Sequence, residues 1–365
     1  MTTDVFIPAP YVNKLENGSC TWQSPSNIAL VKYWGKLENQ IPANPSISFT
    51  LDNCHTRTTL EYVKKESGDD KSTFSFKVYL NDELKEDFAP KIEVFFKRVV
   101  AYLPFLKEYH FTIKTFNSFP HSSGIASSAS GMSALALCLM DLEKQLLGSM
   151  EKDFFNKKAS FLARLGSGSA CRSIEGPIVG WGTHKNIEGS TDLYGVQYLG
   201  AVHKVFENYQ DTILLVDVGE KKVSSTVGHS LMNGHPFAEQ RFKQAHANLD
   251  KLKEIFESGN LNSFIEVVES EALTLHAMMM TSIPYFILMK PNTLEIIDKI
   301  WEYRKTTGSK ICFTLDAGAN VHILYPENEK ETVLNFIKSE LVAYCKNGKY
   351  ICDQIGFGAS SIDNA

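Results

Sequence analysis

The sequence has no large excess of charge of either sign, and this excludes whole classes of partner. Its 37 lysine and arginine residues stand against 42 aspartate and glutamate residues, which gives a formal net charge of -5. Such a chain has no general positive field to attract a nucleic-acid backbone or an anionic membrane. We therefore expect no nucleic acid and no membrane as partner, and any anionic small molecule has to be bound by a local site.

Long apolar runs are missing as well. The two longest, residues 99–106 and 134–140, fall far short of the roughly 20 residues that cross a bilayer, and Pro104 interrupts the first of them. The first residues of the chain lack the basic start and the continuous apolar stretch of a secretory signal. The two apolar runs are therefore interpreted as pieces of a core.

Paired cysteine motifs and internal repeats are also lacking. The seven cysteines are an odd number, are widely dispersed and form no Cys-x-x-Cys or Cys–His cluster of the zinc-binding type. Reduced thiols of this kind predict a cytoplasmic protein. The absence of a repeat of 20–50 residues excludes a solenoid.

The sequence does contain regular apolar patterns, and the predicted helices and strands occur in groups along the chain. Apolar residues at helical spacing predict helices over residues 88–103, 132–140, 150–165, 236–258, 261–280, 293–306 and 329–345. Alternating patterns predict strands within 46–80, with a hairpin-like connection at 66–71, and over 110–116, 199–206, 211–217, 310–315, 321–325 and 350–356. Grouping rather than strict alternation favours the α+β class. The polar segment 186–195 predicts a boundary between an N-terminal part, 1–195, and a C-terminal part, 196–365.

A stretch of small residues follows a strand and opens a helix, as in a phosphate-binding site. Four consecutive backbone N–H groups can approach an anion there, those of Ser123, Gly124, Ile125 and Ala126. The hydroxyls of Ser127 and Ser128 can contact a phosphate or a bound Mg²⁺. The alternative is a serine-capped helix after a flexible loop. Neither the Walker A motif nor the dinucleotide fingerprint is present.

Three charged residues lie in unusual surroundings. Lys32 interrupts an apolar run; if buried it needs an acid or an anion as partner, and the alternative is a snorkelling lysine on an edge strand. Arg172 follows a cluster of glycines and serines, where its planar fork suits a carboxylate or a phosphate; the alternative is a surface arginine at the start of a helix. Asp316 follows a strand and is placed for catalysis, or it forms an Asp-Ala-Gly turn with its own backbone.

Together these segments resemble, in order, the motifs of the mevalonate diphosphate decarboxylase family of the GHMP kinase superfamily. The matching segments are Ala29-Leu-Val-Lys-Tyr-Trp-Gly-Lys, Asn44-Pro-Ser-Ile-Ser-Phe-Thr-Leu, Gly124-Ile-Ala-Ser-Ser-Ala-Ser-Gly, Gly166-Ser-Gly-Ser-Ala-Cys-Arg-Ser, Val223-Ser-Ser-Thr and Thr314-Leu-Asp-Ala-Gly-Ala-Asn-Val. The resemblance runs from Ser24 to the C-terminus. It implies a two-part α+β GHMP kinase fold, with an N-terminal part like domain 2 of ribosomal protein S5, containing a left-handed βαβ unit, and a ferredoxin-like C-terminal part. It also implies a homodimer.

The same resemblance implies an activity and the roles of individual residues. Members of the family use Mg-ATP to phosphorylate the 3-hydroxyl of mevalonate 5-diphosphate, which then loses phosphate and CO₂ to give isopentenyl diphosphate. Asp316 would orient that hydroxyl and accept its proton, Lys32 would offset negative charge, and Arg172 would hold the substrate carboxylate. Residues Ser123 to Ser128 would bind the ATP phosphates, with Ser127 and Ser128 near the metal. The substrate contacts would come from Tyr33, Lys36, Ser167, Gly168, Ser169, Arg172 and Lys222.

The chain departs from the family pattern in the arginine that binds the substrate diphosphate, and the arginine that eukaryotic relatives have after the third strand has no clear counterpart near Lys85 to Lys97. Many bacterial relatives carry a diphosphate-binding arginine where this sequence has Thr226, and Lys222 or Lys91 could provide the missing charge. This leaves open a decarboxylase of mevalonate 5-phosphate, a mevalonate 3-kinase and a non-catalytic small-molecule sensor. Full decarboxylation is favoured because a 3-kinase has no need to hold a carboxylate rigidly.

Overall fold

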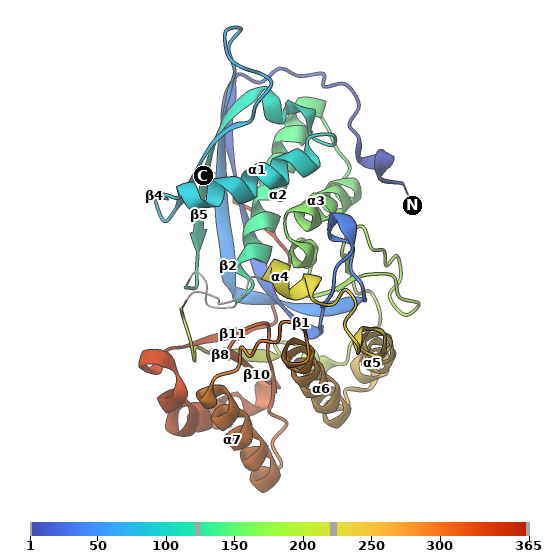
Figure 1. The fold of residues 1–365 in the computed structure, drawn as a ribbon, viewed down its shortest axis with the longest axis vertical. Coiled ribbons are helices and arrows are strands. Elements are labelled where there is room, and N and C mark those ends of the chain that lie inside the picture. Colours follow the sequence, from blue (N-terminus) through green and yellow to red (C-terminus); the bar gives the residue numbers. More distant parts are fainter. Residues whose placement is uncertain (1, 121–124, 220–224, 363–365) are drawn as a thin grey trace.

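The structure is a computed structural model in which residues 2–120, 125–219 and 225–362 are described, apart from the side chains of Ser225 and Thr226. The described chain forms two parts, one above the other in Figure 1, each built on its own sheet. The upper sheet is mixed and the lower one is antiparallel. This confirms the expected α+β class.

Two long strands connect the two parts. β1 (Asn17–Val31) and β2 (Ser46–Lys64) pair over most of their length. Cys20 of β1 lies in the core of the upper part, whereas Ile28, further along the same strand, lies in a second core shared with the lower part. Continuous strands that enter both cores hold the two parts in one arrangement.

The remaining strands extend this large sheet on both sides. Its strand order is β12-β1-β2-β5-β3-β4, and β6 pairs with β2 and β7. The added strands are β3 (Ser75–Leu80), β4 (Glu83–Leu84), β5 (Tyr109–Asn117), β6 (Ile178–Trp181), β7 (Val196–Gln197) and β12 (Ser360–Ser361). β7 and β12 lie after residue 195 but belong to this sheet, so segments from both sides of residue 195 build the upper part. The division at 195 stays a prediction.

The hairpin-like connection predicted at 66–71 is wrong. β5 lies between β2 and β3, antiparallel to the first and parallel to the second. β3 and β5 are joined by helix α1 (Ala89–Val99), because neighbouring parallel strands need a crossover rather than a tight turn. Alternation of apolar residues indicates a strand but does not identify its partner.

Three helices form the core of the upper part with the sheet. α1, α2 (Ser127–Leu147) and α3 (Lys152–Gly166) lie on one side of it in Figure 1. α2 is buried almost all round, because α3 covers it on one side and β1 and β2 on the other. This burial holds the first turn of α2 at the level where the two parts meet.

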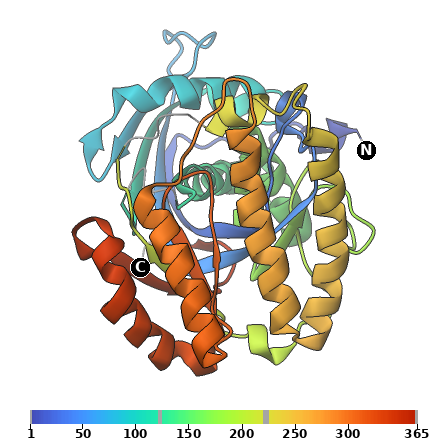
Figure 2. The ribbon, with the colours of Figure 1, turned by 60° about the horizontal axis from the view of Figure 1, so that its bottom comes forward.

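The lower part is a four-stranded sheet covered by helices. Its strand order is β11-β8-β10-β9. The strands are β8 (Gln210–Leu214), β9 (Cys312–Thr314), β10 (Val321–Tyr325) and β11 (Tyr350–Gln354). The helices are α4 (Ser225–Ser230), α5 (Ala238–Ser258), α6 (Leu261–Met280), α7 (Pro291–Thr307) and α8 (Lys330–Phe336). Figure 2 shows α5, α6 and α7 next to one another.

Two predicted elements of this part differ from the structure. No strand forms over 199–206: Leu199 and Val202 are exposed, and only a short 3-10 turn, Lys204–Phe206, is present. The helix predicted over 329–345 keeps α geometry only to Phe336, and a π turn and a 3-10 turn continue it. Beyond Phe336 the apolar side chains of Ile337 and Leu341 are still buried in the core, so the apolar pattern continues where the α-helical hydrogen bonding does not.

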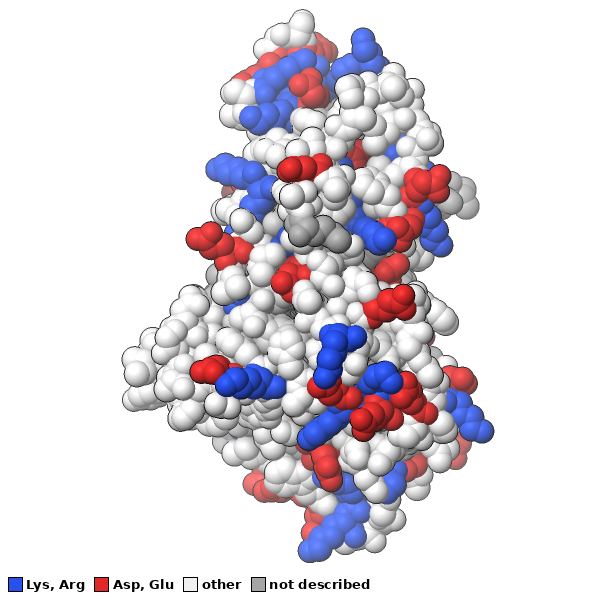
Figure 3. Space-filling model, turned by 90° about the vertical axis from the view of Figure 1, so that its right-hand side faces the viewer, with Lys and Arg blue, Asp and Glu red and all other residues white. Residues whose placement is uncertain are grey.

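Surface charge, helix length and the state of the thiols complete the description of the fold. On the face shown in Figure 3, positive and negative side chains are interspersed. Among the described helices, none is long and apolar enough to cross a membrane. All seven cysteines are free, and six of them are buried.

Candidate active site

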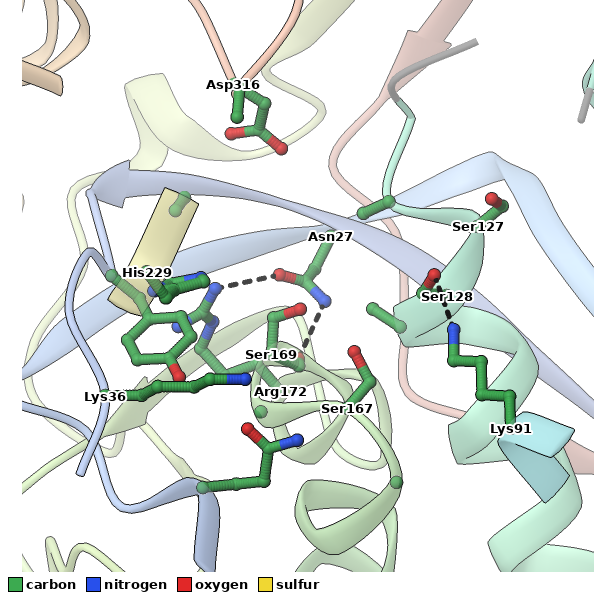
Figure 4. Close-up of a pocket in the computed structure, with 18 of the residues that line it drawn as sticks. Asn27, Lys36, Lys91, Ser127, Ser128, Ser167, Ser169, Arg172, His229 and Asp316 are labelled. Atoms are coloured by element: carbon green, nitrogen blue, oxygen red, sulfur yellow. Dashed lines mark hydrogen bonds between the residues drawn. The ribbon is translucent and has the colours of Figure 1, made fainter. Parts of the chain in front are cut away.

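A cavity of about 810 Å³ lies where the two parts meet, and we refer to it as the cleft. The sites predicted from sequence come together here (Figure 4). The predicted residues that line it are Lys32, Tyr33, Lys36, Ala126, Ser127, Ser128, Ser167, Gly168, Ser169, Arg172 and Asp316. They come from both parts of the chain, so the cleft exists only in the assembled fold.

Four predicted residues do not line the cleft in the described structure. Ser123, Gly124 and Lys222 lie outside the described residues. Ile125 is described, but its side chain is buried in the core and its carbonyl oxygen accepts a hydrogen bond of 2.8 Å from the Ser26 hydroxyl. The predicted roles of these residues stay predictions.

Lys32 and Asp316 form an ion pair at the cleft. Lys32 is the residue after the end of β1, and Asp316 lies in the loop between β9 and β10. The Lys32 Nζ and Asp316 Oδ1 atoms are 3.0 Å apart. Lys32 is only 1% exposed, so it is no snorkelling lysine. Burial lowers the pKa of Lys32, and the carboxylates of Asp316 and Glu271 oppose that shift.

Asp316 combines a turn with this ion pair. Its carbonyl oxygen accepts a hydrogen bond of 2.7 Å from the Gly318 N–H group, so a turn forms at Asp-Ala-Gly through backbone groups. Its side chain nevertheless pairs with Lys32 and stays 30% exposed. A carboxylate that is paired and still accessible can contact a ligand.

Arg172 is buried with an incomplete set of hydrogen-bond partners. It lies on the 3-10 helix Gly168–Ser173 and is 3% exposed, so it is no surface arginine. Its Nη1 donates to the Ser46 hydroxyl and its Nη2 to Asn27 Oδ1 at 3.4 Å. Its Nε has no hydrogen-bond partner among the described residues. Because an unmet buried donor is costly, this atom indicates a place for an anionic ligand.

The first turn of α2 presents hydroxyl groups to the cleft. Ala126, the residue before the helix, has left-handed backbone angles (φ 44°, ψ 35°), and no side chain among the described residues caps the helix. The alternative of a serine-capped helix is therefore wrong. Ser128 Oγ instead accepts a hydrogen bond of 3.1 Å from Lys91 Nζ, on α1 (Figure 4). The sequence suggested Lys91 only as a replacement for the missing arginine charge. In the structure it lies at the predicted phosphate site.

Sequence reasoning missed Asn27, which supports Arg172. Its Oδ1 accepts from Arg172, and its Nδ2 donates to Ser173 Oγ at 2.8 Å and to the Ser169 carbonyl at 3.3 Å. A single polar residue in the strand pattern gives little signal. The apolar run that follows Asn27 nevertheless indicates that its amide is buried, and a buried amide needs a polar partner.

Sequence reasoning also missed His229, on α4. Its Nδ1 accepts a hydrogen bond of 3.0 Å from the Gly35 N–H group, and its ring lies 4.2 Å from that of Tyr33 and 4.6 Å from that of Trp34. Burial, followed by the nearby charges of Lys36 and Arg172, lowers the pKa of His229 to about 3. The ring is therefore neutral near pH 7 and, with Nδ1 accepting, carries its proton on Nε2.

We expect stability to fall between pH 7 and pH 5 through two buried histidines. Burial lowers the pKa of His229 to about 3 and that of His276 to about 4, whereas both protonate near 6.5 in the unfolded chain. The unfolded state then binds more protons than the folded state, so each histidine costs about 2 kcal/mol at pH 5. Melting temperatures at the two pH values measure this loss.

Matched variants test that assignment. In His229→Asn and His276→Gln the drop in melting temperature between pH 7 and pH 5 should be smaller. Thr306→Ser, an exposed change on α7 that adds and removes no titratable group, offers a control and should leave the drop unchanged. An unaltered drop in the first two variants would mean that other groups cause the pH dependence.

Comparisons with known proteins give two family models that together span most of the chain. The model described as diphosphomevalonate decarboxylase-like N-terminal domain matches residues 24–192. The model described as mevalonate 5-diphosphate decarboxylase C-terminal domain matches residues 212–357. The diphosphomevalonate decarboxylase of Ganoderma lucidum is 30% identical, with 94% of this chain and 86% of the relative covered. The human enzyme of the same name is 26% identical over 87% of this chain and 78% of its own.

Solved structures agree with these matches. The mevalonate diphosphate decarboxylase from Staphylococcus aureus superposes with a TM-score of 0.80 at 27% identity, covering 95% of this chain and 98% of that one. A structure of a protein abbreviated MDDEF, in complex with MVAPP, AMPPCP and magnesium, gives a TM-score of 0.78 at 26% identity and covers 94% and 98%.

Proposed function

The chain belongs to the diphosphomevalonate decarboxylase family, and on that basis we propose that it decarboxylates mevalonate 5-diphosphate with consumption of ATP. The observation that carries the proposal is the meeting of three charged side chains, Lys32, Arg172 and Asp316, in one cleft with the first turn of α2. The proposed reaction needs one group to orient the substrate hydroxyl, one to offset negative charge and one to hold the substrate carboxylate. Asp316, Lys32 and Arg172 can fill these three roles.

The residues at the start of α2 suit the phosphates of a nucleotide. Ser127, Ser128 and Lys91 offer two hydroxyls and a positive charge beside a helix end that no described side chain caps. Among the described residues no group of three His, Cys, Asp or Glu side chains can hold a metal, so Mg²⁺ would be bound through these hydroxyls and the nucleotide phosphates. When bound, Mg-ATP supplies the phosphoryl group that makes the 3-hydroxyl a leaving group. The relative whose structure contains AMPPCP and magnesium supports the use of ATP and Mg²⁺.

Asp316 and Lys32 act on the substrate hydroxyl. The accessible carboxylate of Asp316 orients the hydroxyl and accepts its proton. Lys32, held 3.0 Å from that carboxylate, offsets the negative charge that gathers during phosphoryl transfer. Because Lys32 is buried, no reorganisation of water is needed around it when this charge develops.

Arg172 binds the substrate carboxylate, and its unpaired Nε supports this role. Loss of CO₂ breaks the bond between C1 and C2, whose electrons form the double bond between C2 and C3 as the phosphate leaves C3. Holding the carboxylate fixes the breaking bond relative to the leaving group. The chemistry needs no pyridoxal phosphate or thiamine, because the leaving group at C3 takes the electrons.

Tyr33, Lys36, Ser167 and Ser169 bind the 5-diphosphate in this proposal. Tyr33 supports it, because its hydroxyl is buried and has no hydrogen-bond partner among the described residues. His229, whose ring lies 4.2 Å from that of Tyr33, also lines the cleft and is a further hydrogen-bond donor through Nε2–H. A homodimer and a cytoplasmic location belong to the same proposal and rest on the family resemblance and the free thiols.

A substrate comparison tests the function directly. With mevalonate 5-diphosphate and ATP we expect ADP and CO₂ in equal amounts, and much lower rates with mevalonate and with its 5-phosphate. An ADP-coupled assay with trapped CO₂ measures both products. ADP without CO₂ would indicate a 3-kinase, faster turnover of the 5-phosphate would indicate a monophosphate decarboxylase, and no product from any of the three would indicate a sensor.

A further inference from the structure

We propose that two side chains of α6, Glu271 and His276, hold the backbone of both members of the Lys32–Asp316 pair and so set the distance between them. Both are positioning residues, since neither lines the cleft. The proposal rests on the proposed function, because it assigns these residues a part in that reaction. Figure 1 shows α5 and α6 below β1, and Lys32 follows the last residue of that strand.

Glu271 acts on Lys32 together with Arg241, on α5. The Lys32 N–H group donates to Glu271 Oε2 at 2.9 Å, and Arg241 Nη2 donates to the Lys32 carbonyl at 3.0 Å. Arg241 and Glu271 also pair with each other at 2.6 Å, and both side chains are completely buried. One buried ion pair therefore binds both polar backbone atoms of Lys32.

This ion pair is too specific to be explained as a stabilising contact alone. Taking two charges out of water costs several kcal/mol, so a buried pair is weak evidence for stability. Glu271 offsets that cost with further bonds, including one of 2.6 Å from Asn248 Nδ2. Lys32 lies beyond the last residue of β1, so the ladder does not fix it. The Arg241–Glu271 pair fixes the backbone of Lys32 instead, assisted by Asn44 Nδ2, which donates to the Lys32 carbonyl at 2.9 Å.

His276 acts on Asp316 in the same way. Its Nε2 lies 3.1 Å from the Asp316 carbonyl oxygen, which can only accept, so Nε2 carries the proton. His276 is 1% exposed. Asp316 is also outside its strand, β9. The same helix thus supports a residue from each of the two parts, and a shift of about 1 Å in such a pair can cost about 10²-fold in rate.

The test compares His276→Phe with His276→Gln. Phenylalanine fills the ring's volume but removes the donor, whereas glutamine places an amide N–H near the position of Nε2. We expect kcat to fall about 10- to 100-fold in His276→Phe, with the KM for substrate and for ATP changed less than threefold, and to recover most of this loss in His276→Gln. Activity is measured per folded molecule, with folding followed by circular dichroism.

Glu271 is tested together with its partner, because a single change leaves a buried charge unpaired. In the double variant Arg241→Met, Glu271→Met the apolar side chains replace both charges, and kcat should again fall at least tenfold at similar KM. The control is Glu269→Gln, also on α6, whose ion pair with Arg304 at 2.6 Å does not touch the cleft. Its kcat should change less than threefold.

The outcomes separate the positioning role from the function. If the unaltered chain forms no CO₂ from mevalonate 5-diphosphate, the proposed function fails. If it does and His276→Phe, folded, keeps its kcat, the positioning role fails and the function stands. A fall of kcat in Glu269→Gln as large as in His276→Phe would likewise overturn the positioning role, since it would be a general effect of altering α6.

Discussion

Asp316→Asn should lower kcat by about 10³- to 10⁴-fold while nucleotide binding stays nearly unchanged. Asparagine has the same shape, and its amide oxygen can still accept from Lys32 Nζ, so the loop between β9 and β10 keeps its main contacts. What is lost is the negative charge that accepts the hydroxyl proton. Steady-state turnover and calorimetric titration with an ATP analogue measure the two effects.

The same change alters the state of Lys32. Burial lowers the pKa of Lys32, and the carboxylate of Asp316 is the largest influence that opposes it. In the variant Lys32 should therefore lose its proton at a lower pH. Asp250→Asn, on α5 and outside the cleft, is a control that should retain turnover. Near-normal turnover of Asp316→Asn would remove Asp316 from the chemistry.

Arg172→Lys should slow CO₂ release by about 10²- to 10³-fold, and ADP should exceed CO₂ in the products. The guanidinium contacts Ser46 and Asn27 and lies 5.8 Å from the Trp181 ring, and its buried Nε has no hydrogen-bond partner among the described residues. A lysine carries one nitrogen and cannot replace this fork. A carboxylate that is held loosely leaves phosphorylation possible but misaligns the bond to be broken.

A second buried arginine provides the control for this experiment. Arg164, on α3, is 1% exposed and donates to the backbone carbonyls of Leu193 and Asn39, but it does not line the cleft. Arg164→Lys should lower the melting temperature without changing the ratio of ADP to CO₂. Equal ratios and unchanged rates in Arg172→Lys would contradict the role of Arg172 as the carboxylate ligand.

Much of the fold was predictable because its elements have regular apolar patterns. Helices α3, α5, α6 and α7 lie within a few residues of their predicted bounds, since each buries one face and repeats its apolar residues accordingly. The wrong strand over 199–206 and the wrong hairpin after β2 have a shared cause. A local pattern describes what a segment buries, whereas pairing depends on which distant segment lies beside it.

The candidate site was predictable only where a residue contrasts with its local surroundings. Lys32 interrupts an apolar run, Arg172 follows small residues, and Asp316 ends a strand, so each could be named from its neighbours. Glu271 and His276 lie in an ordinary amphipathic helix, and nothing in their local pattern separates them from solvent-facing residues. Their contacts to Lys32 and Asp316 appear only when the helix is placed beneath the cleft.

The sequence by itself determined the classes of residue available, the family resemblance and the absence of any general field for a polyanion. Only the tertiary structure decided that Lys32 and Asp316, 284 positions apart, form one ion pair. The physical reason is burial. In the folded chain β1 ends against the helices of the other part, and water is excluded from Lys32. Only then is Lys32 held beside Asp316 and its pKa lowered.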